Sequence, residues 1–339
     1  MTKHKDDNIM RKGIIAAGNW VSDTVKFIRT YPTPGNLVTI ERIEQGFGGC
    51  AHNVLADLAR LKAGIPLYAG GCIGSDALGN ELMQAIANLG IDSSALCRVD
   101  AATSYTDVMA DTTTGTRTFF HHRGANAAFG PEHVEGINAP AKIFHLGYLL
   151  LLDRLDEPDE EYGVVAARVL KSLKERGYQT SVDVVSEEGD RFRRIVLPCL
   201  PYMDYLILNE VEAGACCAMT LRDEQGKILL SEVERAARYL MENGVGKACV
   251  IHFPEGGFGL QDGTPVFVPS FHVPAEEIVS SVGAGDAFCA TMLYALHEEI
   301  PMPKAISMAN AAAWFNLHSA TSTEGAPTLE EINQFLSNH

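Results

Sequence analysis

Short apolar segments typical of β-strands alternate along this chain with longer amphipathic segments typical of helices, and this alternation constrains the fold most. Residues 160–176, for example, place Ala166, Val169, Leu170 and Leu173 at helical spacing. Strands that alternate with helices usually form a mostly parallel sheet with helices on both faces. The sequence therefore predicts a doubly wound α/β fold. We expect strands at 13–19, 67–73, 142–146, 181–185, 205–208 and 248–252, and helices at 53–63, 77–89, 160–176, 231–242, 287–297 and 304–318.

Two segments, 25–45 and 103–122, break this alternation. Both alternate apolar with polar residues, and each contains a turn, at 31–35 and at 113–115. They predict strands outside the main sheet, either as a small antiparallel β-lid over the ligand site or as an extension of the sheet edge. The sequence shows neither an internal repeat nor an inter-domain linker. We expect a single domain spanning 1–339, with lid strands inserted at about 24–46 and 103–123.

The charge balance excludes two classes of partner. The chain has 43 acidic residues against 27 Lys and Arg, a net charge of -16. Such a protein repels nucleic acid and anionic membrane surfaces, so we expect neither as a partner. No apolar run approaches the roughly 20 residues of a membrane helix. The 8 cysteines form no CxxC pair, which indicates reduced thiols. We expect a cytoplasmic protein with a frayed, polar N-terminus at 1–12.

The run Gly283-Ala284-Gly285-Asp286 lies directly before an apolar segment with helical character. Small residues let backbone N–H groups approach a phosphate, and a helix N-terminus adds partial positive charge. A carboxylate in the first turn can accept the proton of an attacking hydroxyl. Phosphoryl transfer requires this charge stabilisation and an oriented nucleophile. A glycine-rich turn with a capping Asp has the same appearance, so the run needs support from elsewhere.

A second glycine run, at 46–53, again precedes a helix. Gly48 and Gly49 would let a substrate pack against bare backbone, and Asn53 in the first helical turn can bond a sugar hydroxyl. Asp23 follows the first predicted strand, and ligands of doubly wound sheets bind at the carboxyl ends of strands. A simple strand-to-helix turn with a polar cap is the alternative interpretation.

Asn209-Glu210-Val211-Glu212 directly follows another predicted strand, and its first and last residues could hold Mg²⁺ through water. With these four elements in this order, the chain resembles the ribokinase-like (PfkB) carbohydrate kinase family. The run from Gly48 to Asn53, together with 74–79, is similar to the family's N-terminal signature, and 281–288 to its C-terminal signature. The element at 209–212 matches the family's NxxE motif. The resemblance extends from about residue 13 to about residue 327.

The resemblance implies an ATP-dependent sugar kinase that uses Mg²⁺ and forms a homodimer through its lid. In such a kinase a carboxylate accepts the proton of the sugar hydroxyl, and backbone N–H groups form an anion hole for the γ-phosphate. Carried over to this sequence, Asp286 would be the base, and Gly283, Ala284 and Gly285 would form the anion hole. The sugar would be bound by Asp23, Gly48, Gly49 and Asn53. Asn209 and Glu212 would hold Mg²⁺ and phosphates, and Gly257 and Asn310 would bind the nucleotide.

Three departures from the family pattern leave questions open. Ser280-Ser281 stands where family members usually have Asp-Thr, so dependence on a monovalent cation is uncertain. Cys50 stands where ribokinases have Lys, and Val21 where they have Asn, which argues against plain ribose as substrate. The strand after 248 leads into His252-Phe253-Pro254-Glu255-Gly256-Gly257, so the nucleotide side matches only in part.

Several functions therefore remain in competition. The leading hypothesis is phosphorylation of a sugar hydroxyl by ATP, and a nucleoside kinase shares the same motifs. Arg123, at the end of a lid strand, could bind the carboxylate or phosphate of an acidic sugar, or it is simply a surface residue. A non-catalytic sugar-binding regulator is the rival from another class, and retention of Asp286 argues against it. No Walker-type GxxxxGK[ST] run is present, which excludes a P-loop kinase.

Overall fold

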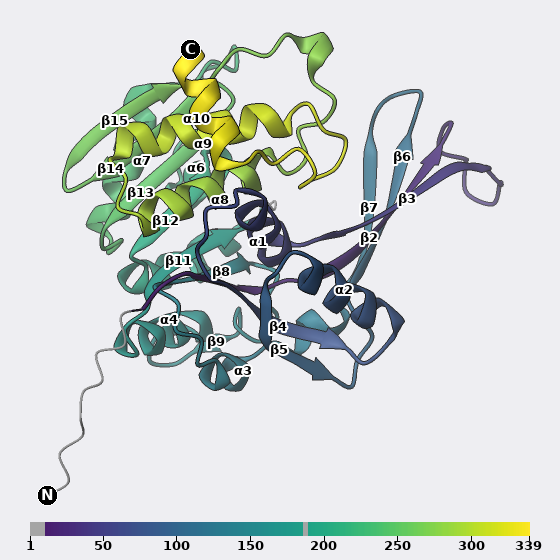
Figure 1. The fold of residues 1–339 in the computed structure, drawn as a ribbon, viewed down its shortest axis with the longest axis horizontal. Helices are drawn as coiled ribbons and strands as arrows, with labels where there is room; N and C mark the ends of the chain where they lie inside the picture. The colour runs from purple at the N-terminus through teal and green to yellow at the C-terminus, as the bar shows by residue number, and fades with distance from the viewer. Residues whose placement is uncertain (1–10, 186–188) are drawn as a thin grey trace, which may run out of the picture.

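The computed structural model describes residues 11–185 and 189–339, so most of the predicted frayed N-terminus lies outside the described residues. A nine-stranded sheet forms its centre, in the order β15-β14-β13-β12-β11-β8-β1-β4-β5 (Figure 1). The pairings from β13 to β5 are parallel, whereas β14 and β15 join antiparallel at one edge. The predicted doubly wound, mostly parallel sheet is confirmed. The strands are β1 (Ile14–Gly18), β4 (Leu67–Gly74), β5 (Asp92–Val99), β8 (Ile143–Leu149), β11 (Gln179–Val184), β12 (Tyr205–Asn209), β13 (Ala248–Phe253), β14 (Gly256–Gln261) and β15 (Thr264–Pro269).

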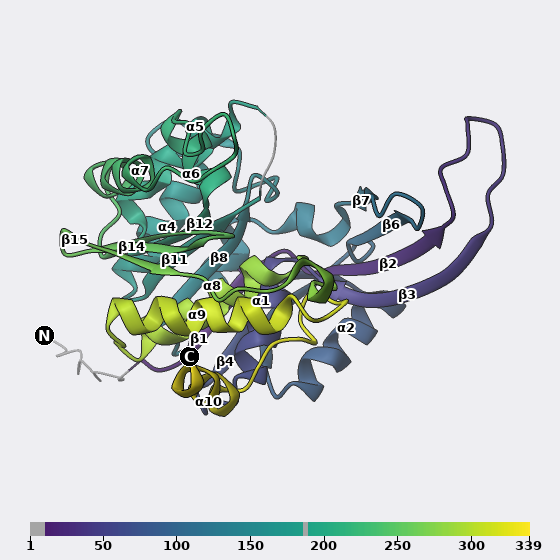
Figure 2. The same cartoon turned by 90° about the horizontal axis from the view of Figure 1, so that it is seen from above.

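Helices cover both faces of this sheet because its strands are apolar on both sides. In β1, Ile14 and Ala16 pack into one core, and Ile15 and Ala17 into the other. Figure 2 shows α8, α9 and α10 on one side and α6 and α7 on the other. Helix α8 is apolar all round, as a helix enclosed by its neighbours must be. The helices are α1 (Cys50–Arg60), α2 (Ala77–Asn88), α3 (Pro131–Gly136), α4 (Val165–Glu175), α5 (Arg191–Ile195), α6 (Glu210–Cys217), α7 (Leu230–Glu242), α8 (Ala284–His297), α9 (Met302–Asn316) and α10 (Leu329–Asn338).

The main error among the predicted elements concerns the helix expected at 160–176, which begins only at Val165. The preceding residues form a small hairpin of β9 (Pro158–Asp159) and β10 (Gly163–Val164). The Asp159 carboxylate accepts hydrogen bonds from the backbone N–H groups of Glu161 and Tyr162, each at 3.0 Å. Such a side-chain turn competes with the first turn of a helix, and periodicity alone does not reveal it. Strands β5 and β15 were also not predicted.

The two segments that break the alternation form a separate sheet in the order β3-β2-β6-β7. Its strands are β2 (Val21–Ile28), β3 (Ile40–Gly48), β6 (Tyr105–Asp111) and β7 (Arg117–His122). The predicted small lid is confirmed, and the alternative of an extended sheet edge is wrong. Its outer pairs are antiparallel and its central pair, β2 with β6, is parallel. The lid projects from the body of the molecule (Figure 1), and β3 leads directly into α1.

None of the helices in the described ranges combines the length and the apolar character that crossing a membrane would require. The longest helices instead pack against the central sheet. Helix α9, with 15 residues, contacts β14 and β15. The helices therefore bury the two faces of the sheet. They also fix the position of its carboxyl edge, where the lid is attached.

Candidate active site

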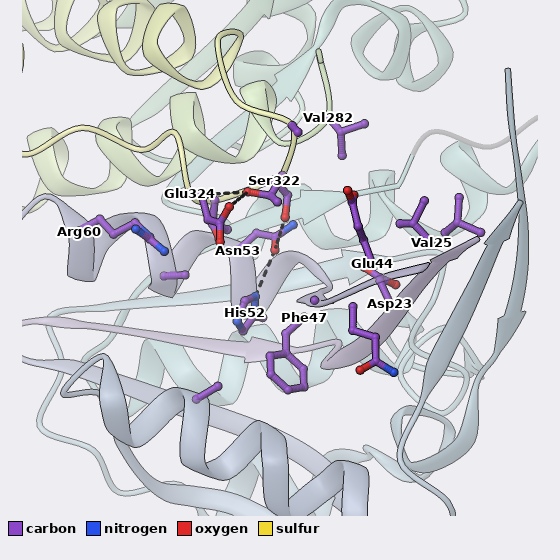
Figure 3. A pocket seen from close by; sticks show the side chains of 18 of the residues that line it. Asp23, Val25, Glu44, Phe47, His52, Asn53, Arg60, Val282, Ser322 and Glu324 are labelled. Atoms are coloured by element: carbon purple, nitrogen blue, oxygen red, sulfur yellow. Dashed lines mark hydrogen bonds between the residues drawn. The ribbon is translucent and has the colours of Figure 1, made fainter. Parts of the chain in front are cut away.

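Two cavities lie next to each other at the carboxyl edge of the central sheet. The first, of about 440 Å³, lies between the lid and α1 (Figure 3). The second, of about 640 Å³, lies among the ends of β12 and β13 and the helices α8 and α9. In the loop before α8, Ser281 lines the second cavity and Val282 the first. This loop therefore forms part of the wall between two compartments, each large enough for a small molecule.

Asp286, in the first turn of α8, is not itself among the residues that line either cavity, but its side-chain contacts and its chain neighbours connect it to both. Its Oδ2 atom accepts a hydrogen bond of 2.9 Å from Nδ2 of Asn53, which lines the first cavity. Gly285, the residue before it, lines the second cavity. Burial raises the pKa of Asp286 to about 6, and the hydrogen bonds from Asn53 and Tyr148 partly offset this rise. The carboxylate is therefore ionised near neutral pH yet basic enough to accept a proton.

The glycine at the start of α8 is required by its conformation. Gly283 has a φ of 84° and caps the helix in the left-handed region, where a side chain is strained. A Cβ atom there would lie 2.1 Å from the carbonyl oxygen of Ser322. At Gly285 a Cβ atom would come within 3.2 Å of the His252 ring. Bare backbone thus faces the second cavity at Gly285, and the first-turn N–H groups of the helix offer positive charge to an anion.

The second glycine run and Asp23 lie on the lid side of the first cavity. A Cβ atom at Gly48 would lie 2.1 Å from Oδ2 of Asp23. Because glycine has none, the carboxylate packs against bare backbone. Gly49 caps α1 with a φ of 88°. Burial raises the pKa of Asp23 to about 6, although a hydrogen bond with Thr106 lowers it. Figure 3 shows Asn53 across the cavity from this region.

The comparison with known proteins decides the family. The family model "pfkB family carbohydrate kinase" matches residues 17–329, which includes the cavities and the residues between them. The chain belongs to this family. PfkB kinases are phosphotransferases that act on an alcohol group, and ribokinase relatives use ATP, so this chain is an ATP-dependent carbohydrate kinase.

Relatives of known name match over almost the full length of this PfkB kinase. The ribokinase of Haemophilus influenzae is 25% identical over 330 residues, covering 96% of this chain and 99% of the relative. The aminoimidazole riboside kinase of Salmonella typhimurium is 26% identical over 300 residues, covering 86% and 88%. Arabidopsis thaliana ribokinase, solved with ribose and ATP, has the same fold, with a TM-score of 0.79 at 22% identity over 96% of this chain and 99% of that one.

Asn209 and Glu212 cap α6 of this PfkB kinase at the rim of the second cavity. Oδ1 of Asn209 accepts from the Glu212 N–H at 2.9 Å, and Oε2 of Glu212 accepts from the Asn209 N–H at 3.0 Å. Glu212 is 5% exposed, and Asn209 lines the cavity. Asn310 also lines it, and its side-chain N–H group donates to the carbonyl oxygens of Val268 and Pro269.

Two predicted site residues lie elsewhere. Gly257 is buried beneath α8 and α9, where a Cβ atom would approach Ile306 Cγ2 at 2.6 Å, so its smallness serves packing. Nη1 of Arg123 pairs with Oδ1 of Asp153 at 2.6 Å, in a half-exposed ion pair. Among the described residues, neither Gly257 nor Arg123 lines either cavity or lies next to a residue that does. Five other predicted residues also line neither cavity, but each is next to a lining residue in the chain or bonded to one: Gly48, Gly49, Glu212, Gly283 and Asp286. The geometry gives no support to a ligand contact by either.

Sequence reasoning missed several side chains that line the cavities. His52 and Ser322 contact Oδ1 of Asn53, at 3.2 Å and 3.3 Å (Figure 3). The position of His52 beside Asn53 in the glycine run was a usable signal, whereas Ser322 comes from a loop without a motif. The apolar lining was missed as well: Phe47, Leu89 and Phe119 in the first cavity, and Phe253 and Trp314 in the second.

Proposed function

We propose that this PfkB kinase binds a sugar-like acceptor in the first cavity and ATP in the second, with Asp286 as the general base. The single observation that supports this most is the placement of Asp286. Its carboxylate is bonded to Asn53, which lines the first cavity, and Gly285, the residue before it, lines the second. An acceptor hydroxyl and a phosphoryl group that approach from the two sides would meet at this carboxylate.

The proposed transfer uses residues on both sides of this carboxylate. Asp23 accepts hydrogen bonds from hydroxyl groups of the acceptor, and the amide of Asn53 can both donate to them and accept from them. Together they hold one hydroxyl next to Asp286. The carboxylate takes the proton of this hydroxyl as the hydroxyl oxygen attacks the γ-phosphorus of ATP, and the bond from that phosphorus to the bridging oxygen breaks to release ADP. Backbone N–H groups at 283–285 and the N-terminus of α8 stabilise the charge on the phosphoryl oxygens. The lid would exclude water and so suppress hydrolysis of ATP.

The second cavity has the chemistry expected for a magnesium nucleotide. The aromatic rings of Phe253 and Trp314 can pack against a purine base. Asn209 and Glu212 supply the oxygen donors that Mg²⁺ prefers, and their mutual hydrogen bonds favour contact through water. Bound Mg²⁺ would neutralise phosphate charge, which a protein with net charge -16 must do locally.

The lid strands carry exposed apolar side chains that support a homodimer. Ile43 on β3 is 56% exposed, and Phe120 on β7 is 55% exposed. Exposed apolar groups gathered on one small sheet mark a surface for association. A cytoplasmic location is consistent with cysteines that are all unpaired, since thiols stay reduced there.

A nucleoside is a second candidate acceptor, favoured by the apolar part of the first cavity. Phe47, Leu89 and Phe119 line it together with the polar residues around Asn53. A plain sugar presents hydroxyl groups on most of its surface, whereas a base attached to ribose offers a flat, less polar face. The aromatic lining suits such a group.

We expect ADP to form from Mg·ATP only when a suitable acceptor is present. A panel of sugars, sugar acids, sugar phosphates and nucleosides should contain at least one compound that raises ADP formation well above the acceptor-free rate. A coupled assay for ADP measures this. If no member of a broad panel does so while the protein still binds a sugar, the chain is a sugar-binding regulator and the proposal fails.

Replacing Asn53 with Ala should move the acid limb of the pH–rate profile to higher pH. The amide of Asn53 donates to the carboxylate and lowers the pKa of Asp286, so its loss lets that pKa rise further above its ordinary value. The measurement is turnover at saturating acceptor on both sides of pH 6. Ser322→Ala is the control, because it removes only the contact with Oδ1 of Asn53. An unshifted limb in Asn53→Ala would argue against Asp286 as the titrating base.

A further inference from the structure

A second cluster of reactive side chains lies at the same sheet edge and has no part in the proposed transfer. Cys50 begins α1, His145 lies in β8 and Asp183 lies in the neighbouring strand β11. Sγ of Cys50 lies 3.3 Å from Nε2 of His145 and 3.2 Å from Oδ2 of Asp183. One ligand atom from each of the three falls within 4.8 Å of the others. Cys50 and His145 have no exposed surface.

These separations are close to those around a single metal ion. In a tetrahedral zinc site with sulfur and nitrogen ligands, neighbouring ligand atoms lie about 3.5 Å apart. The thiol, imidazole and carboxylate are all zinc ligands, and a three-ligand set leaves a fourth position for water or a substrate atom. Magnesium, by contrast, prefers oxygen donors alone. The cluster therefore suits a zinc-class ion better than the cation that accompanies ATP.

The surroundings orient these groups as a metal site requires. Nδ1 of His145 lies 3.1 Å from Oγ of Ser181, so an Nδ1–H group can donate there and leave the Nε2 lone pair facing Cys50. Metal-bound histidines usually have such a partner on the other nitrogen. Gly147 leaves room for the thiol, because a Cβ atom there would lie 2.2 Å from Sγ.

We propose that Cys50, His145 and Asp183 form a binding site for one zinc-class divalent ion, distinct from the magnesium nucleotide site. Binding forms bonds from the ion to Sγ, Nε2 and a carboxylate oxygen, and the thiol proton passes to solvent. The ion would lie at the first turn of α1, the helix that carries Asn53. The proposal does not depend on the phosphoryl-transfer mechanism, because metal binding can be measured without nucleotide or acceptor.

Cobalt titration of the metal-free, full-length protein tests this site. We expect a thiolate-to-cobalt absorption band that saturates near one ion per chain and disappears on addition of zinc, but not of excess magnesium. Cys50→Ser should abolish the band, and His145→Gln should weaken zinc binding at least tenfold by calorimetry. Cys97→Ser, a half-buried thiol on β5, is the matched control and should bind as the wild type does.

Two outcomes would overturn the proposal. One is the absence of a thiolate band in the wild type, and the other is a band that Cys50→Ser retains. Should Cys50→Ser fail to fold, Asp183→Asn replaces it, with an expected tenfold or greater loss of zinc affinity while the band persists. Unchanged affinity in that variant contradicts the site equally.

Discussion

Asp286→Asn is expected to lower turnover by about 10²–10⁴-fold, the contribution of a positioned general base. The amide keeps the size of the carboxyl group and can still accept the hydrogen bond from Asn53, but it cannot take the hydroxyl proton. The melting temperature should stay the same or rise slightly. Burial holds the pKa of Asp286 at about 6, above its ordinary value, so the ionised form is disfavoured in the folded protein. Turnover and thermal unfolding of the purified variant measure the two effects.

Asp57→Asn is the matched control for this prediction. Asp57 is a fully buried carboxyl group on α1, one helical turn beyond Asn53, and burial raises its pKa well above the usual range. Neither carboxyl group lines a cavity in the described part of the chain, but Asp286 is bonded to the cavity residue Asn53, whereas the Asp57 oxygens have no hydrogen-bond partner there. The same change of carboxyl to amide should therefore leave turnover within a few-fold of the wild type. Equal loss in both variants would show that Asp286 acts through folding rather than chemistry.

Gly283→Ala is expected to reduce both stability and turnover. A side chain at a φ of 84° costs roughly 1–2 kcal/mol, and the new Cβ atom must also displace the carbonyl of Ser322, which lies 2.1 Å from its position. The start of α8 has to shift, which misplaces the N–H groups proposed for the anion hole. We expect a loss of about 2 kcal/mol or more in the free energy of unfolding and more than tenfold in turnover. Denaturant unfolding and steady-state kinetics measure these.

Gly64→Ala is the control that separates the cost of backbone strain from the cost of a steric clash. Gly64 also has a positive φ, of 70°, but a Cβ atom there would meet no atom within 4 Å. This control should lose only the cost of the left-handed conformation and keep wild-type turnover. If Gly283→Ala retains full turnover, the loop before α8 has no role in phosphoryl transfer.

The strand and helix rhythm was sufficient to predict the fold because parallel strands buried on both faces are apolar throughout. The hairpin at 158–164 escaped prediction because a single side chain, Asp159, sets its turn. The parallel pairing of β2 with β6 was also beyond reach, since it joins segments about 80 residues apart and no local pattern records which strands become neighbours.

The site was predictable where the residues of a motif are close together in the sequence, because local backbone geometry then fixes how they lie. Gly283, Gly285 and Asp286 form the cap and first turn of α8, so helix geometry fixes their positions relative to one another. Gly257 was assigned to the nucleotide from its place in the sequence, yet its neighbours turned out to be core side chains. The cluster of Cys50 with His145 and Asp183 joins three distant segments, so only the folded chain brings it together.

Transfer of a labelled γ-phosphate from ATP to an acceptor is the most direct test of the proposed function. With an acceptor from the panel that raises ADP formation, the label should appear on the acceptor with the wild-type protein and fall by about 10²–10⁴-fold with Asp286→Asn. Label found only in inorganic phosphate, or an equal amount on the acceptor with both proteins, would contradict a kinase that uses Asp286 as its base.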